Sequence, residues 1–173
     1  MIDNTPQFII KFADFLYKRI LQIELIFLSL GIVALLLSSF NKVLGEVILI
    51  LSLIPLGMTY YLFGLRITEP KFDKFHCRLT YYSYSVAVIS TLFVLQMWKG
   101  GIFIHQLGLI AVVFSILSYL ILGITLKKIR TIKQTEIIRT LIIFLVLSLL
   151  FLTSNYKELK TVAENENSIE ITE

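Results

Sequence analysis

Charged residues are scarce in this chain of 173 residues: they make up only 16% of it, whereas hydrophobic residues make up 57%. The mean hydropathy is correspondingly high, at +0.83. A soluble domain of this size could not cover so much apolar surface with so few charges. The scarcity of charge therefore excludes an ordinary soluble fold and indicates an integral membrane protein.

Cysteine and histidine are also scarce, with one cysteine, Cys77, and two histidines, His76 and His105. A single cysteine cannot form an intramolecular disulfide, and it makes a poor metal site without further ligands. We assign the two histidines to opposite sides of the membrane, where they cannot jointly hold a haem iron or zinc. The sequence has no glycine-rich phosphate loop, CxxC pair or HExxH helix. We therefore expect no metal, no cofactor and no catalytic residues, and predict that the chain is not an enzyme.

Long apolar runs are abundant, and they approach the roughly 20 residues that a helix needs to cross about 30 Å of hydrocarbon. The first run is too long for a signal-peptide core and is followed by no convincing A-x-A cleavage pattern, so we interpret it as a retained helix. The predicted fold is an all-α integral membrane helical bundle with five transmembrane helices. They are expected at residues 20–40, 47–65, 82–98, 107–126 and 137–153, of which the third and fifth are the shortest.

The segment before the first run has the pattern of an amphipathic helix. Phe8, Phe12, Phe15 and Leu16 fall on one helical face, opposite Lys11, Asp14 and Lys18. Such a helix is expected to lie flat on the inner membrane surface, although a partner protein could use the same face. The predicted organisation is an interfacial helix (1–19), a transmembrane hairpin (20–65), a basic loop (66–81), a second hairpin (82–126), a second basic loop (127–136), a fifth transmembrane helix (137–153) and an acidic, disordered tail (154–173).

Basic residues predict the orientation, because positively charged loops are retained on the cytoplasmic side. With five spans, twelve of the 16 lysines and arginines fall on one side, so the N-terminus is expected to be cytoplasmic and the C-terminus external. Tyr17, Tyr60, Tyr61 and the tyrosines of residues 81–85 fall at the cytoplasmic boundary, and Trp98 at the external one. We interpret these aromatic residues as interfacial anchors in preference to a cation-binding aromatic box.

Two parts of the chain resemble one another and predict an internal repeat. "SLGIVALLL", from Ser29, aligns with "SVAVISTLF", from Ser85, at an offset that also pairs Gly45 with Gly101. The stretch "WKGGIFIHQ" is then the second external turn, with glycines for the reversal, Trp98 as an anchor and His105 near the membrane surface. An even number of spans separates the equivalent helices, so the two hairpins would be parallel repeats.

Small residues at helical spacing predict close helix contacts, since packing drives helix association in lipid. A proline within a predicted span predicts a kink, because it removes a backbone donor. Such a kink could line a cavity or merely shape the bundle. The packing residues are Gly31, Ala34, Ser38, Ala87 and Ser90, and the kink is expected at Pro55 and Gly57.

Glu24 is the one carboxylate predicted to lie inside the membrane, about one turn from the cytoplasmic end of its helix. A buried charge needs a partner, and Arg139 lies at a similar depth in the fifth predicted helix. We predict a structural Glu24–Arg139 pair that fastens this helix to the first hairpin. In the alternative, Glu24 reaches the interface and Arg139 pairs with Glu136.

These features favour a non-enzymatic, multi-pass protein of the cell membrane, inner or plasma, that acts as an accessory or assembly subunit through helix contacts. A carrier or channel for a small or apolar solute, built on the repeat and the proline kink, is the alternative, and a membrane enzyme is a third. The expected partners are the lipid bilayer and either another membrane protein or further copies of the chain. We expect no nucleic-acid partner, because topology and anionic lipid account for the basic segments.

Overall fold

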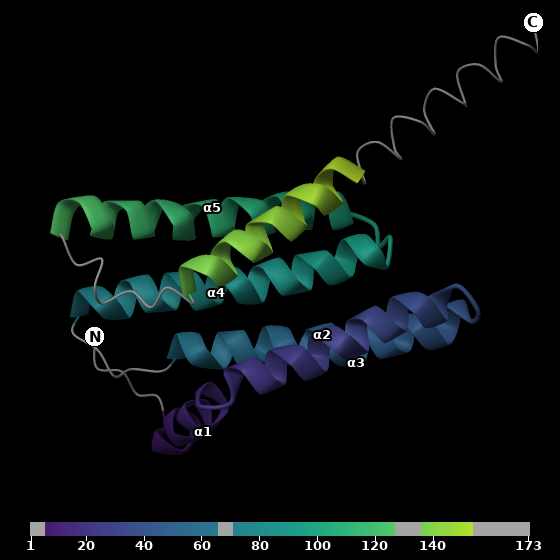
Figure 1. The fold of residues 1–173 in the computed structure, drawn as a ribbon, viewed down its shortest axis with the longest axis horizontal. Coiled ribbons are helices and arrows are strands. Elements are labelled where there is room, and N and C mark those ends of the chain that lie inside the picture. Colours follow the sequence, from purple (N-terminus) through teal and green to yellow (C-terminus); the bar gives the residue numbers. More distant parts are fainter. Residues whose placement is uncertain (1–5, 66–70, 127–135, 154–173) are drawn as a thin grey trace, which may run out of the picture.

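In the residues that the computed structural model describes, every regular element is an α-helix (Figure 1). The structure describes residues 6–65, 71–126 and 136–153, and these ranges hold six helices. They are α1 (Gln7–Tyr17), α2 (Ile20–Ser38), α3 (Lys42–Leu65), α4 (Lys71–Leu95), α5 (Gly101–Leu126) and a sixth helix (Glu136–Thr153). The all-α fold class is confirmed.

Four of these helices are long and apolar enough to cross a membrane: α2, α3, the Gly101–Ile121 part of α5, and the sixth helix. They identify a multi-pass membrane protein. The fifth predicted span, 137–153, meets this criterion. The third, 82–98, falls mostly in α4, which does not meet it, and its last three residues lie in the turn after α4. The physical reason is composition, because serine, threonine and tyrosine residues interrupt the apolar residues of α4.

Several helices begin earlier than the apolar runs predict. The start of α3 is Lys42 instead of residue 47, and the start of α5 is Gly101 instead of residue 107. The largest correction concerns the predicted basic loop at 66–81, because α4 already begins at Lys71. Hydropathy identifies only the apolar part of a helix, whereas backbone hydrogen bonding continues through polar residues. The predicted tail at 154–173 and most of the second basic loop lie outside the described residues.

Helices α2, α3, α4 and α5 form a row in which each packs against its neighbours in the chain (Figure 1). The sixth helix crosses α4 and α5 obliquely in this view. The reversals after α2 and after α4 both lie at the right-hand end of Figure 1, and α1 lies toward the opposite end. Consequently α3 and α5 run in the same direction, with α4 antiparallel between them.

The two reversals have different local causes. In the first, the Asn41 side chain accepts a hydrogen bond of 3.1 Å from the Leu44 amide and so caps α3. In the second, Met97 and Gly100 have positive φ angles of 52° and 79°, and glycine adopts that conformation without steric cost. The stretch around Trp98 is therefore a tight turn, and the Trp98 ring packs edge-on against Phe93 at 4.8 Å between centroids.

Helix α1 packs against the bundle with one face and exposes another. Ala13 is fully buried, and Leu16 and Tyr17 pack against the tyrosine-rich core at this end of the bundle. Leu16 is thus a correction, because the sequence places it with the outward phenylalanines. Phe8, at 76% exposure, is one of three phenylalanines that remain on the outside, with Phe12 and Phe15.

Candidate functional site

An ion pair deep in the bundle joins Glu24 of α2 to Arg139 of the sixth helix. Arg139 Nε lies 2.7 Å from Glu24 Oε1, and Arg139 Nη2 lies 3.1 Å from Glu24 Oε2. Both side chains are only 12% exposed. The guanidinium therefore meets the carboxylate through a charge-assisted hydrogen bond from Nη2 and a close ion-pair contact at Nε. The structure brings together the two residues that the sequence pairs.

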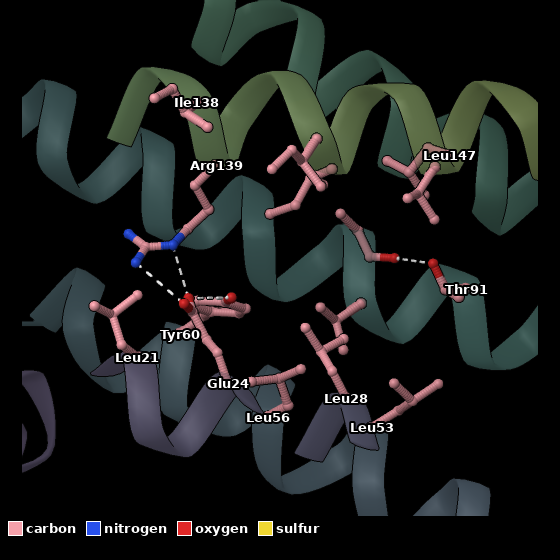
Figure 2. A pocket seen from close by; sticks show the side chains of 15 residues that line it. Leu21, Glu24, Leu28, Leu53, Leu56, Tyr60, Thr91, Ile138, Arg139 and Leu147 are labelled. Carbon is pink, nitrogen blue, oxygen red and sulfur yellow. Dashed lines mark hydrogen bonds and ion pairs between the residues drawn. The ribbon is translucent and has the colours of Figure 1, made fainter. Parts of the chain in front are cut away.

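Tyr60 completes this pair from α3. Its hydroxyl donates a hydrogen bond of 2.6 Å to Glu24 Oε1, and its side chain is almost fully buried. The carboxylate thus accepts hydrogen bonds from two helices besides its own, as Figure 2 shows. A buried charge with this many partners is compensated, so its location indicates a fastening role between helices.

The alternative pairing of Arg139 with Glu136 is not formed in the structure, where the Glu136 side chain binds two tyrosines instead. Its Oε1 accepts hydrogen bonds from the hydroxyls of Tyr81, at 3.1 Å, and Tyr17, at 3.3 Å. Its backbone carbonyl accepts from the Tyr84 hydroxyl at 3.1 Å, and that hydroxyl also contacts Thr140. The first turn of the sixth helix is therefore held by three tyrosines from α1 and α4.

These contacts correct the interpretation of the tyrosines as interfacial anchors. Tyr60, Tyr81 and Tyr84 are at most 4% exposed and form part of the core. Their rings also pack edge-on against one another, with centroids 5.4 Å apart for Tyr60 and Tyr84 and 5.8 Å apart for Tyr81 and Tyr84. Tyr61, by contrast, is 51% exposed, which fits an outward anchor. A sequence cannot distinguish these roles, because a buried and an interfacial tyrosine occupy the same helical level.

The two histidines lie in opposite halves of the bundle, His76 near the start of α4 and His105 near the start of α5. His105 is fully buried within the bundle, about one turn after the start of α5. Its Nε2 donates a hydrogen bond of 2.8 Å to the Leu147 carbonyl of the sixth helix. His76 Nδ1 lies 2.7 Å from the Ser118 hydroxyl. Both histidines therefore join helices, and the described residues contain no cluster of three metal-ligating side chains.

The predicted packing residues lie at close helix contacts. Gly31 and Ala34 are buried, and a Cβ at Gly31 would lie 3.6 Å from Ser52 Oγ of α3. On the second hairpin, Ala87 and Ser90 are buried beside Gly108 of α5. Ser38 is exposed, but its backbone lies against Gly45, where a Cβ would collide with it. All five predicted positions are thus at points where small residues permit backbones to approach.

Pro55 and Gly57 both lie inside α3, where their contacts are with neighbouring parts of the bundle. Helix α3 continues through Pro55, and the Thr59 hydroxyl donates to the Pro55 carbonyl at 2.8 Å. A Cβ at Gly57 would lie 3.0 Å from Cδ1 of Ile89, so Gly57 permits α3 to approach α4. Sequence reasoning interprets Gly57 as part of a kink, whereas its neighbours show a packing contact.

A groove of about 440 Å³ lies between α2 and the sixth helix (Figure 2). Leu21 and Leu28 of α2 form one wall, Ile138 and Leu147 belong to the other, and α3 and α4 supply the floor. The Glu24–Arg139 pair and Tyr60 also line it, whereas Pro55 and Gly57 do not. Sequence reasoning misses this groove, because hydropathy does not reveal which spans leave space between them.

No family model, curated protein or solved structure matches this chain.

Proposed function

We propose that the chain crosses the membrane five times, with α4 as the third span. Because α3 and α5 run in the same direction, a chain that crosses in both must return between them. Helix α4 has 25 residues, which at about 1.5 Å per residue exceeds the roughly 30 Å of hydrocarbon. Its hydroxyls have protein partners: Ser83 donates to the Ala111 carbonyl at 2.8 Å, and Thr80 accepts from Ser115 at 3.1 Å.

The proposed orientation places α1 at the cytoplasmic surface of the membrane. Lys11, Lys18 and Arg19 lie at the end of the bundle where α2 begins, and Lys42 and Lys99 flank the reversals at the other end. Single cysteines introduced at Lys11 and Lys99, with Cys77 replaced by serine, would test this by labelling of intact cells. An impermeant maleimide is expected to modify the cysteine at 99 and spare the one at 11, and the reverse pattern would refute the orientation.

We also propose that the two hairpins are parallel repeats, and their close contacts support this. Gly31 of α2 faces Ser52 of α3, while Ala87 of α4 faces Gly108 of α5. Ala87 follows Gly31, and Gly108 follows Ser52, by the same number of residues that separates Gly45 from Gly101. Equivalent positions therefore make equivalent close contacts in the two hairpins, which random apolar runs would not be expected to reproduce.

For the biological role, we propose a non-enzymatic accessory or assembly subunit of a membrane complex. This proposal rests on one observation: the polar side chains deep in the bundle bind to groups on other helices and so hold the helices together. Glu24, Arg139 and Glu136 bind helices to one another, and the His105 bond to the Leu147 carbonyl secures the sixth helix further along. A carrier must move one group of helices against another, whereas these contacts join the sixth helix to α1, α2, α4 and α5.

The proposed partner is an apolar transmembrane helix that packs against the outer face of α2. This helix lies at one end of the row formed by α2, α3, α4 and α5, and much of its apolar surface is exposed. Leu25, Ile32 and Leu36 lie on that surface at 61% to 66% exposure, and their spacing suits a helix–helix seam. A cysteine at Ile32, in a Cys77→Ser background, is expected to form one discrete cross-linked species in native membranes. The matched control is a cysteine at Phe114, on the exposed side of α5.

Two results would refute this role: no adduct from Ile32, or the same adducts from Ile32 and Phe114. A cross-linked species that contains a second copy of the chain would instead assign the surface to a homo-oligomer. Identification of the adduct by mass spectrometry separates these outcomes, and purification in mild detergent then gives the stoichiometry.

The groove favours a second candidate, a carrier of a small apolar solute, because its lining is almost entirely apolar. The position of Pro55 and Gly57 outside this lining removes one support from that alternative. Solute flux into vesicles that contain the purified protein tests it. Flux above that of protein-free vesicles, abolished by a bulky residue in the groove, would favour the carrier over the subunit.

A further inference from the structure

The groove between α2 and the sixth helix has two chemically different parts. Along most of its length the lining is apolar, with Leu28, Leu53 and Val146 among the contributing residues. Polar atoms gather at the end where α2 begins, around Glu24 and Arg139. Both walls belong to helices that can span a membrane, so the opening between them faces hydrocarbon.

A second, shallow hollow on the surface adjoins this polar end. It is bounded by Lys18, Arg19, Ile20, Leu21 and Gln22, and Leu21 lines both spaces. Lys18 and Arg19 are exposed, and the Arg19 guanidinium lies 5.0 Å from the centre of the Phe15 ring. The apolar groove thus ends beside a basic surface hollow at the level where α1 meets α2.

The dimensions of the groove suit a ligand that is narrower than a helix. Leu21 to Leu28 and Ile138 to Leu147 extend over about 10 to 14 Å of helix at about 1.5 Å per residue, so 440 Å³ corresponds to a mean cross-section of roughly 30 to 40 Å². A helix about 10 Å in diameter has a cross-section of roughly 80 Å² and would fill that volume within about one turn. A hydrocarbon chain therefore fits within this space along its length, whereas a partner helix would project out of it.

We propose that the groove and the basic hollow together bind an anionic phospholipid of the surrounding leaflet. One acyl chain lies in the groove between α2 and the sixth helix, and the phosphate lies at Lys18 and Arg19. Arg139 and Tyr60, at the junction, face the region of the ester groups. Apolar lining with a few polar groups at one end is typical of sites for amphiphilic ligands, and basic residues near the membrane surface attract anionic lipids. This inference does not depend on the proposed subunit role.

The test uses phosphatidylglycerol and phosphatidylcholine with identical photoreactive acyl chains, each added to the full-length protein in nanodiscs. Cross-linked peptides are identified by mass spectrometry. Phosphatidylglycerol is expected to label α2 and the sixth helix in preference to the outer side of α5, and to do so more strongly than phosphatidylcholine. Equal labelling by the two lipids, or uniform labelling around the bundle, would overturn the proposal and indicate ordinary boundary lipid.

Two variants separate the two parts of the site. Val146→Trp fills the groove and is expected to lower acyl-chain labelling severalfold, whereas Val113→Trp, at a similarly exposed valine of α5, should leave it unchanged. Lys18→Gln combined with Arg19→Gln should lower the preference for phosphatidylglycerol roughly 30-fold, from about 1 kcal/mol for each basic residue near the surface. Equal effects of the two tryptophans would overturn the groove assignment, and an unchanged lipid preference would overturn the headgroup assignment.

Discussion

The Glu24–Arg139 pair gives the sharpest prediction about how the sixth helix is held. Glu24→Gln and Arg139→Gln each leave one formerly paired group at a site where both side chains are only 12% exposed. Removing one partner of a buried pair costs about 3–5 kcal/mol in soluble proteins, and hydrogen bonds within membrane bundles are worth less, so about 2–4 kcal/mol is expected for each variant. Both changes are expected to promote separation of the sixth helix from α2.

The double variant distinguishes a direct pair from two independent effects. Once one partner has been removed, replacing the other relieves an uncompensated charge, so the combined loss should fall short of the sum by about 1.5 kcal/mol or more. Unfolding of the purified protein by increasing SDS in mixed micelles, followed by circular dichroism, measures all four proteins. Tyr60 remains in place throughout, and the change of its acceptor from a carboxylate to an amide oxygen occurs equally in Glu24→Gln and in the double variant, so it cancels in the comparison.

A second ion pair in the same chain provides the control. Lys42 and Glu46 lie 3.9 Å apart on the exposed start of α3, with side-chain exposures of 84% and 40%. Exposed pairs of this kind contribute about 0.2–1 kcal/mol, so Lys42→Gln and Glu46→Gln should barely change stability. Additive losses for Glu24 and Arg139, or losses no larger than those of this control, would refute the fastening role.

Three further variants test individual contacts in the bundle. Tyr84→Phe should lower stability by about 1 kcal/mol through loss of its hydrogen bonds to the sixth helix, whereas Tyr61→Phe, on the exposed side of α3, should have no effect in the same SDS titration. Gly108→Leu should cost about 1–3 kcal/mol by overpacking against α4, and a normal unfolding midpoint would show that the contact is not tight. His105→Phe removes the donor to the Leu147 carbonyl, and faster proteolysis of the sixth helix than in the parent protein is the expected result.

The predicted Glu24–Arg139 pair illustrates what sequence reasoning can find and where it stops. Glu24 stands out because a carboxylate within an apolar run is costly, and Arg139 is the basic residue at a matching depth. The contribution of Tyr60 is not visible in the same way, since tyrosine is equally common at membrane boundaries and in cores. Only the rotation of α3 about its axis directs the Tyr60 hydroxyl toward Glu24.

The sequence alone determined that this is an all-helical membrane protein, because apolar runs of this length and so little charge have few other stable arrangements. It also identified the small residues at helix contacts, through their spacing. Tertiary structure decided which residues are buried and where space remains, because both depend on the rotation and tilt of each helix. It placed Tyr81, Tyr84 and His105 inside the bundle and extended α4 to Lys71. It also left a groove between α2 and the sixth helix. Hydropathy reports the average surroundings of a segment, whereas a helix that contacts several others has sides that meet different neighbours, and only packing assigns each residue to one of them.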